Sequence, residues 1–315
     1  MKLSYSVLGA GAMGSVFGAR LALKGHSVEL LNRTPDHSKA IKEQGGLICH
    51  LDQQKHLIPL QADLVARAKA VDVVFIFTKT HQIKEALANL PSNLRSAHFI
   101  TLQNGLGNGE QVAAYVGIDQ TVEGVSIMPA EFIKPGEVGS AGSSETWMFA
   151  ANGEQNEIVN QVGEDLNQAG LKTHITGNVR TFIWQKACFN MAMNALCGLV
   201  EGSPGLLQQF PDGRQLAHEI AEEVITIAQF EGASVNPEKV HDLIDYACAD
   251  HTHHRPSMLQ DLQAQRLTEI ESLNGYLVTA ARKHGKEVPL THLMARLIRL
   301  RERAPEFWAK EPTYH

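Results

Sequence analysis

Three polar residues at helical spacing are candidates for chemistry. Lys186, Asn190 and Asn194 follow one another at i, i+4 and i+8 in a segment otherwise rich in apolar residues. At 3.6 residues per turn they share one helix face within roughly 80°. If this face lines a site, a partly desolvated lysine can donate a proton, and the asparagine amides can bind hydroxyl and carboxylate groups. The alternative is a solvent-exposed polar stripe on an amphipathic helix.

A glycine-rich segment near the N-terminus indicates a nucleotide site. The pattern G-x-G-x-x-G is formed by Gly9, Ala10, Gly11, Ala12, Met13 and Gly14. It lies between a predicted strand over 3–8 and a helix-like run over 10–24, which is the context that dinucleotide binding requires. There the glycines permit a tight turn, close approach of a pyrophosphate and close helix packing, and the helix N-terminus attracts phosphate. The alternative is a tight β-turn-α unit without a ligand.

The residues after the second predicted strand, 26–31, bear on which dinucleotide binds. NAD-selective sites usually place a carboxylate at the end of that strand, and here the chain continues with Asn32, Arg33 and Thr34. Arg33 stands where a 2′-phosphate would lie, and a guanidinium binds phosphate through paired hydrogen bonds. We therefore predict NADP(H) rather than NAD(H), unless Arg33 is a solvated loop residue.

Strand-like and helix-like runs alternate through the first half of the chain, which is typical of βαβ units around a parallel sheet. Apolar runs over 73–77 and 98–102 predict buried strands, and the Gly- and Ser-rich stretch 122–150 predicts antiparallel edge strands. Beyond Gly177 the spacing predicts helices over 179–200, 214–231, 237–249, 258–284 and 291–302.

Composition sets limits on the function. A chain of 315 residues suggests about two domains. Its net charge of −6 argues against nucleic acid or anionic lipid as a partner. No apolar run reaches the ~20 residues of a membrane span, and the stretch 3–19 fits a β-turn-α unit better than a signal peptide. Buried thiols in a reducing, cytoplasmic compartment are expected for the four cysteines, Cys49, Cys188, Cys197 and Cys248.

Together these motifs resemble the ketopantoate reductase (2-dehydropantoate 2-reductase) family over nearly the whole chain. Their order and spacing carry the resemblance. The motifs are GAGAMG at 9–14, TK-xx-Q at 78–82, LQNGLGN at 102–108, KPGEV at 134–138, W-x-K-xxx-N-xxx-N at 184–194, SMLQD at 257–261, TEI-xx-LNG at 268–275 and HGKEVP at 284–289.

The resemblance implies a fold and an activity. The expected fold is an N-terminal α/β Rossmann-like dinucleotide-binding domain over 1–177, followed by an all-α domain of the 6-phosphogluconate-dehydrogenase C-terminal type over 178–315. The expected reaction is NADPH-dependent reduction of ketopantoate to pantoate, on the route to pantothenate and coenzyme A. The implied partner is a small 2-keto acid, and the implied state is a monomer or homodimer.

Residue roles follow from the same resemblance. Lys186 matches the proton donor and Glu269 its acidic partner. Asn104 matches a residue near both nicotinamide and substrate. Further substrate positions are Asn190, Asn194 and Ser257, and further cofactor positions are Lys79 and Gln82. On their own, Glu269 would be an exposed helix carboxylate, Asn104 a turn residue and Ser257 a helix N-cap.

Departures from the family pattern leave the substrate open. His254 and Pro256 replace an Asn and a Ser that the family often carries before Ser257, and Thr291 replaces an Asn. A reductase of another 2-keto acid and an opine-type condensing enzyme therefore remain alternatives. A non-catalytic NADP(H) sensor is an alternative of another class, and the presence of both Lys186 and Glu269 argues against it. The histidines at 251, 253 and 254 lack the spacing and cysteine partners of a zinc site, so no metal is expected.

Overall fold

The computed structural model describes residues 2–250 and 252–308, and the chain divides into two compact units. The first comprises Met1–Gln103 and Gly107–Val179, and the second comprises Asn104–Leu106 and Arg180–His315. The first is α/β and the second is helical, which confirms the predicted fold class. Among the described residues, no helix is long and apolar enough to cross a bilayer.

The first unit is built on an eight-stranded sheet with the order β12-β11-β8-β7-β6-β1-β2-β5. All neighbouring strands are parallel except the antiparallel pair β11 and β8. The strands are β1 (Ser4–Leu8), β2 (Ser27–Asn32), β5 (Gln61–Leu64), β6 (Val73–Ile76), β7 (His98–Thr101), β8 (Thr121–Ile127), β11 (Glu145–Ala150) and β12 (Lys172–Ile175).

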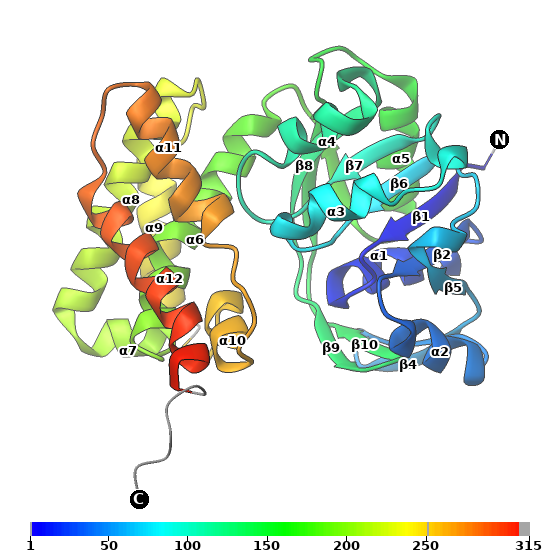
Figure 1. Ribbon diagram of the computed structural model, residues 1–315, viewed down its shortest axis with the longest axis horizontal. Coiled ribbons are helices and arrows are strands. Elements are labelled where there is room, and N and C mark those ends of the chain that lie inside the picture. Colours follow the sequence, from blue (N-terminus) through cyan, green and yellow to red (C-terminus); the bar gives the residue numbers. More distant parts are fainter. Residues whose placement is uncertain (1, 251, 309–315) are drawn as a thin grey trace, which may run out of the picture. The chain divides into compact units, whose positions relative to one another are not determined.

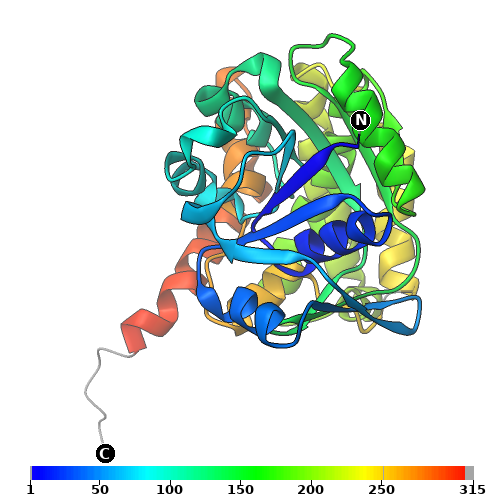
Figure 2. The same ribbon diagram turned by 90° about the vertical axis from the view of Figure 1, so that its right-hand side faces the viewer.

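Both faces of this sheet are covered, because successive strand residues point to opposite faces and apolar residues occupy both sets of positions. Val73 and Phe75 belong to one apolar cluster, which includes residues of α1 and α5, whereas Val74 and Ile76 belong to another, with residues of α3 and α4. Figures 1 and 2 show α1 alongside β1 and β2. The helices of this unit are α1 (Ala12–Leu23), α2 (Pro35–Glu43), α3 (Ile83–Ala88), α4 (Asn108–Val116) and α5 (Glu157–Gln168), with short 3₁₀ turns η1 (Val65–Arg67), η2 (Thr80–Gln82), η3 (Ser92–Leu94) and η4 (Ile118–Gln120).

The region 122–150 forms antiparallel pairs as predicted, but its strands belong to two sheets and most of them are not edge strands. β8 and β11 lie in the large sheet, while β9 (Glu131–Lys134) and β10 (Glu137–Ser140) join β3 (Leu47–Leu51) and β4 (Gln54–Ile58) in a second sheet with the order β4-β3-β10-β9. β10 pairs with β3 in parallel, so the sheet joins segments about 90 residues apart. Pairing between such distant segments leaves no local signal in the sequence.

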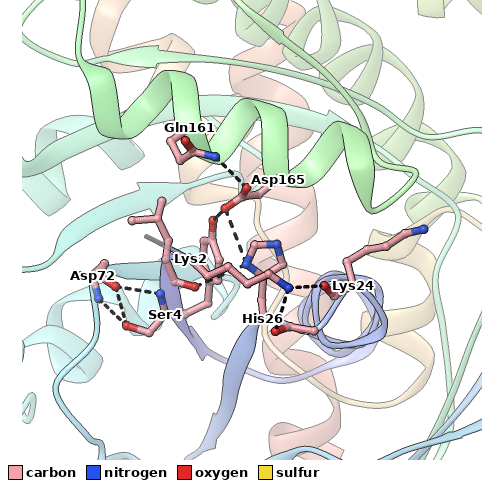
Figure 3. A network of polar contacts seen from close by, with 10 residues as sticks. Lys2, Ser4, Lys24, His26, Asp72, Gln161 and Asp165 are labelled. Carbon is pink, nitrogen blue, oxygen red and sulfur yellow. Dashed lines mark hydrogen bonds and ion pairs between the residues drawn. The ribbon is translucent and has the colours of Figure 1, made fainter.

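A buried polar network ties α5 to the large sheet. Asp165 accepts a hydrogen bond from the hydroxyl of Tyr5 on β1, and Gln161 Nε2 donates to its other oxygen at 3.0 Å. Nδ1 of His26 lies 3.7 Å from the Asp165 carboxylate. Figure 3 shows Asp165, Gln161 and His26 converging beneath the helix. Because Asp165 is buried, its partners are required to offset the loss of water.

The second unit is a helical bundle around one apolar core (Figure 1). Its elements are α6 (Val179–Leu199), α7 (Pro204–Gln209), α8 (Pro211–Phe230), α9 (Pro237–Asp250), α10 (Ser257–Gln263), the π-helical segment η5 (Glu271–Gly275), α11 (Tyr276–Lys283) and α12 (Pro289–Trp308).

The single helix expected over 258–284 is wrong, because the chain breaks after α10. Gln265 has a positive φ of 53°, which ends the helix. Thr268 then donates from its backbone N–H and its hydroxyl to Glu302 of α12, at 2.7 Å each. Apolar spacing continues across this break and therefore could not reveal it.

Candidate active site

Helix α6 carries the polar face expected from the spacing. Asn190 and Asn194 are each 8 % exposed, and Lys186 is half-buried. The neighbours of these residues, Cys188, Met191 and Ala195, lie in the apolar core of the second unit. The alternative of a solvent-exposed stripe is therefore wrong.

Helix α10 packs against the end of this polar face. Gly198 continues the i+4 series, and a Cβ on it would lie 3.0 Å from Leu262 Cδ1 and 3.7 Å from Met258 Cγ. Ser257 directly precedes Met258, so it lies near the Asn194 end of the face and away from the Lys186 end. Ser257 is exposed and is the first residue of α10, while Pro256 occupies the N-cap.

Glu269 meets the other end of the face. Its side chain is buried, and its Oε2 accepts a hydrogen bond from Asn104 Nδ2 at 3.4 Å. It precedes η5 instead of lying on an exposed helix, which corrects the interpretation from its sequence context alone. Asn104 lies in the short segment Asn104–Leu106, which belongs to the second unit although the chain on both sides of this segment belongs to the first. The second unit thus brings Asn104, Glu269 and the face of α6 together.

The electrostatics of Lys186 suit a proton donor. Burial lowers the pKa of Lys186 to about 8, and the charge of Glu269 opposes this by favouring the protonated amine. A general acid works best with a pKa near the operating pH. Lys186 therefore holds its proton at neutral pH and gives it up more readily than an ordinary lysine does.

In the first unit, the glycine segment forms the turn between β1 and α1. Gly9 has a φ of +91°, and a Cβ there would lie 2.5 Å from the backbone nitrogen of Thr78. A Cβ on Gly14 would lie 2.7 Å from the Gly9 carbonyl oxygen, whereas one on Gly11 would meet nothing within 4 Å. Gly9 and Gly14 are required by packing, while Gly11 leaves open space before the α1 N-terminus, where Ala12 and Met13 present N–H groups without helical acceptors.

The end of β2 also fits a dinucleotide. Asn32 is buried and its Nδ2 has no hydrogen-bond partner among the described residues, so a donor is available beside the loop. Arg33 is exposed directly after the strand. Lys79 caps η2 and Gln82 ends it; both are half-buried and follow Thr78, which packs under Gly9. The residues present therefore fit the expected cofactor.

A buried histidine supports this loop and was missed from the sequence. The backbone N–H of Gly136 donates to His37 Nδ1 at 2.9 Å, so the proton of the neutral ring lies on Nε2, 3.2 Å from Ser15 Oγ. Ser15 Oγ in turn donates to the Ala10 carbonyl at 3.1 Å. Burial lowers the pKa of His37 to about 4, which keeps the ring neutral. His37 stands in the polar run PDHSKAIKE, and only the pairing of distant strands brings Gly136 to it.

Other candidate groups have no place in this chemistry. All four cysteines are free and buried, as expected. Among the described residues, no group of three His, Cys, Asp or Glu side chains could hold a metal ion. His253 and His254 are exposed, and His251 lies outside the described residues.

Comparisons with known sequences agree over nearly the whole chain. The family Ketopantoate reductase PanE/ApbA matches residues 5–153, and its C-terminal counterpart matches residues 178–302. A 2-dehydropantoate 2-reductase of Streptococcus pyogenes serotype M3 is 30 % identical over 298 residues, covering 94 % of this chain and 97 % of the relative. One from Halobacterium salinarum is 30 % identical over 301 residues, with 94 % and 98 % covered.

Solved structures share the fold. A D-mandelate dehydrogenase in a ternary structure with NADH and anilino(oxo)acetate has a TM-score of 0.91 at 26 % identity, covering 96 % of this chain and 100 % of that one. A PanE/ApbA family ketopantoate reductase from Ralstonia eutropha JMP134 has a TM-score of 0.88 at 25 % identity, with 96 % and 100 % covered. The chain therefore belongs to the ketopantoate reductase PanE/ApbA family of nicotinamide-dependent 2-keto acid reductases.

Proposed function

We propose that this enzyme uses NADPH to reduce ketopantoate to pantoate, with Lys186 as the proton donor. The observation that carries the proposal is the half-buried Lys186, whose pKa is lowered to about 8 within reach of the Glu269 charge. The names of the sequence relatives, 2-dehydropantoate 2-reductases, support the choice of substrate.

Bound NADPH would supply the hydride for the keto carbon. Lys186 Nζ then holds a proton at the keto oxygen and transfers it as negative charge develops there, which gives the alcohol. Glu269 keeps Lys186 charged before the transfer, and the neutral amine recovers its proton from solvent. Because Glu269 also accepts from Asn104, the carboxylate and the amide hold each other in place beside the reacting oxygen.

The remaining polar groups of this face are assigned to the substrate. The amides of Asn190 and Asn194 donate to its carboxylate and hydroxyl groups, and Ser257 contributes a hydroxyl near the Asn194 end. Such polar residues are costly inside an apolar bundle unless a ligand satisfies them. The burial of Asn190 and Asn194 therefore supports a binding role.

We assign the phosphate side to the first unit. The turn at Gly9–Gly14 and the α1 N-terminus hold the pyrophosphate, with Lys79 and Gln82 on the cofactor side. Arg33 holds a 2′-phosphate, since no carboxylate ends β2. The D-mandelate dehydrogenase structures contain NADH, so a direct comparison of NADPH with NADH tests this assignment.

A second candidate is the reduction of a bulkier 2-keto acid. The likeness to D-mandelate dehydrogenase favours it, as do His254 and Pro256, which replace smaller or amide-bearing residues just before Ser257. A non-catalytic NADP(H) sensor is a weaker alternative, because it would not need a lysine of lowered pKa beside a buried carboxylate.

Turnover by the purified enzyme tests the proposal. NADPH and NADH are each mixed with ketopantoate, with phenylglyoxylate, and with pyruvate with and without an amine, and loss of cofactor absorbance is followed. The proposal expects NADPH with ketopantoate to give the highest kcat/KM. Faster turnover of phenylglyoxylate would select the second candidate, and cofactor binding without any turnover would select the sensor.

A further inference from the structure

The π-helical segment η5 interrupts the bundle next to Glu269. The N–H of Gly275 donates to the carbonyl of Ile270 at 2.9 Å, an i to i−5 bond that widens the turn. The N–H of Tyr276 donates to Leu273 and not to Ser272, which would be its acceptor in a regular α-helix. π-Helical turns are rare and are frequent at functional sites.

The carbonyl of Ser272 bonds outside its own helix. It accepts a hydrogen bond from the backbone N–H of Leu106 at 2.8 Å. Both residues are buried, so this bond is shielded from water. It joins η5 to the short segment Asn104–Leu106, which belongs to the same unit.

Gly105 makes this contact possible. Its φ is +92°, and a Cβ on it would lie 2.6 Å from Ser272 Oγ and 2.8 Å from the Ser272 carbonyl oxygen. Distances under about 3.0 Å to backbone atoms force the chain to move. Only glycine at position 105 therefore allows the segment Asn104–Leu106 to pack closely against Ser272.

The other side of η5 is fixed to helix α6. Asn274 is fully buried, and its Nδ2 donates to the carbonyl of Met191, next to Asn190, at 3.3 Å. Ser272 Oγ also donates to the Glu269 carbonyl at 3.1 Å. One short segment thus connects the backbone of Glu269, the helix that carries Lys186 and the loop that carries Asn104.

We propose that η5 is a positioning element for the reaction, in which the Ser272 carbonyl and Gly105 hold Asn104 against Glu269. The Asn104 to Glu269 hydrogen bond is 3.4 Å long and has little tolerance for a shift of the loop. Ser272 and Gly105 act through Asn104 and are therefore positioning residues. The packing of the segment Asn104–Leu106 against Ser272 is called the docking below. The catalytic consequence of this inference rests on the proposed function, but the docking does not.

Hydrogen exchange at the Leu106 amide tests the docking without any substrate. The full-length chain is compared with Gly105→Ala and with Gly117→Ala, a matched control that has the same φ of +92° but no atom within 4 Å of its Cβ. We expect Leu106 exchange to accelerate at least about tenfold in Gly105→Ala and to stay unchanged in Gly117→Ala. Equal exchange rates at Leu106 in the two variants would overturn the proposal.

Two further measurements keep the docking test decisive. Ser272→Ala keeps the carbonyl and should leave Leu106 protected; loss of protection there would show that the side chain holds the loop, contrary to the proposal. If Gly105→Ala does not fold, the wild-type chain decides alone, because Leu106 must then exchange at least about a hundredfold more slowly than an unstructured amide.

A double-mutant cycle tests the catalytic consequence, with the 2-keto acid that the wild type reduces fastest. Gly105→Ala should lower kcat about ten- to hundredfold, with little change in the KM for NADPH. In an Asn104→Ala background the same substitution should change kcat less than about twofold, because its effect passes through Asn104. Independent, multiplicative losses would refute the positioning role. Absence of wild-type turnover would instead refute the proposed function, and the exchange data would still decide the docking.

Discussion

The protonation of Lys186 should set the upper pH limit of reduction. The pKa of Lys186 is lowered from 10.5 to about 8, so burial, although opposed by the Glu269 charge, disfavours the charged amine by about 3 kcal/mol relative to water. Lys186 is then about 90 % protonated at pH 7 and about 10 % at pH 9. Because the reaction needs the protonated form, kcat/KM for the keto acid should fall about tenfold between these two pH values.

Glu269→Gln should move this upper pH limit to a lower pH. Glutamine keeps an oxygen that can accept from Asn104 but removes the charge that favours protonated Lys186. An opposite charge at about 4–6 Å moves a pKa by about 1–3, so the midpoint should fall to about pH 7 or below. Glu271→Gln is the matched control, because that carboxylate is exposed and pairs with Arg299.

The assay is kcat/KM for the keto acid against pH, at saturating NADPH, for the wild type and both variants. A wild-type limb near pH 10 would contradict the burial argument. An unmoved limb in Glu269→Gln, or an equal shift in Glu271→Gln, would contradict the role given to Glu269.

Three further outcomes are expected. Arg33→Ser should weaken NADPH binding about ten- to hundredfold and leave NADH binding nearly unchanged in fluorescence titrations; equal losses for both cofactors would place Arg33 away from the 2′-phosphate. Gly11→Ala should impair cofactor binding while leaving urea unfolding unchanged, whereas Gly14→Ala should lower the unfolding free energy itself, because only the latter Cβ meets backbone. Tyr5→Phe should lower the unfolding free energy by about 1–3 kcal/mol, since Asp165 loses a buried donor, and an unchanged urea midpoint would show that this bond contributes nothing.

Local patterns were sufficient for the parts of the site that lie on one element. The i, i+4, i+8 series identified the buried face of α6, and the glycine spacing identified the turn before α1. Both patterns depend on helix periodicity or on a tight turn, which are encoded by neighbouring residues.

Features created by distant pairing could not be predicted in the same way. His37 acts through Gly136, 99 residues away, and the docking of Leu106 on Ser272 depends on a π-helical turn that apolar spacing does not reveal. Glu269 and Asn104 could be assigned to the site only from family resemblance, because a carboxylate in the sequence TEIESLNG is locally typical of an exposed helix residue. Glu269 and Asn104 owe their chemical environment to contact with a segment that is distant in the sequence.

The most direct test of the account is the loss of Lys186 alone. Lys186→Ala is compared with the wild type for NADPH binding by fluorescence and for reduction of the best 2-keto acid in a single turnover. We predict unchanged NADPH binding and a rate lowered about 10²- to 10⁴-fold, with no remaining limb near pH 8. Turnover at the wild-type rate with intact cofactor binding would show that Lys186 is not the proton donor.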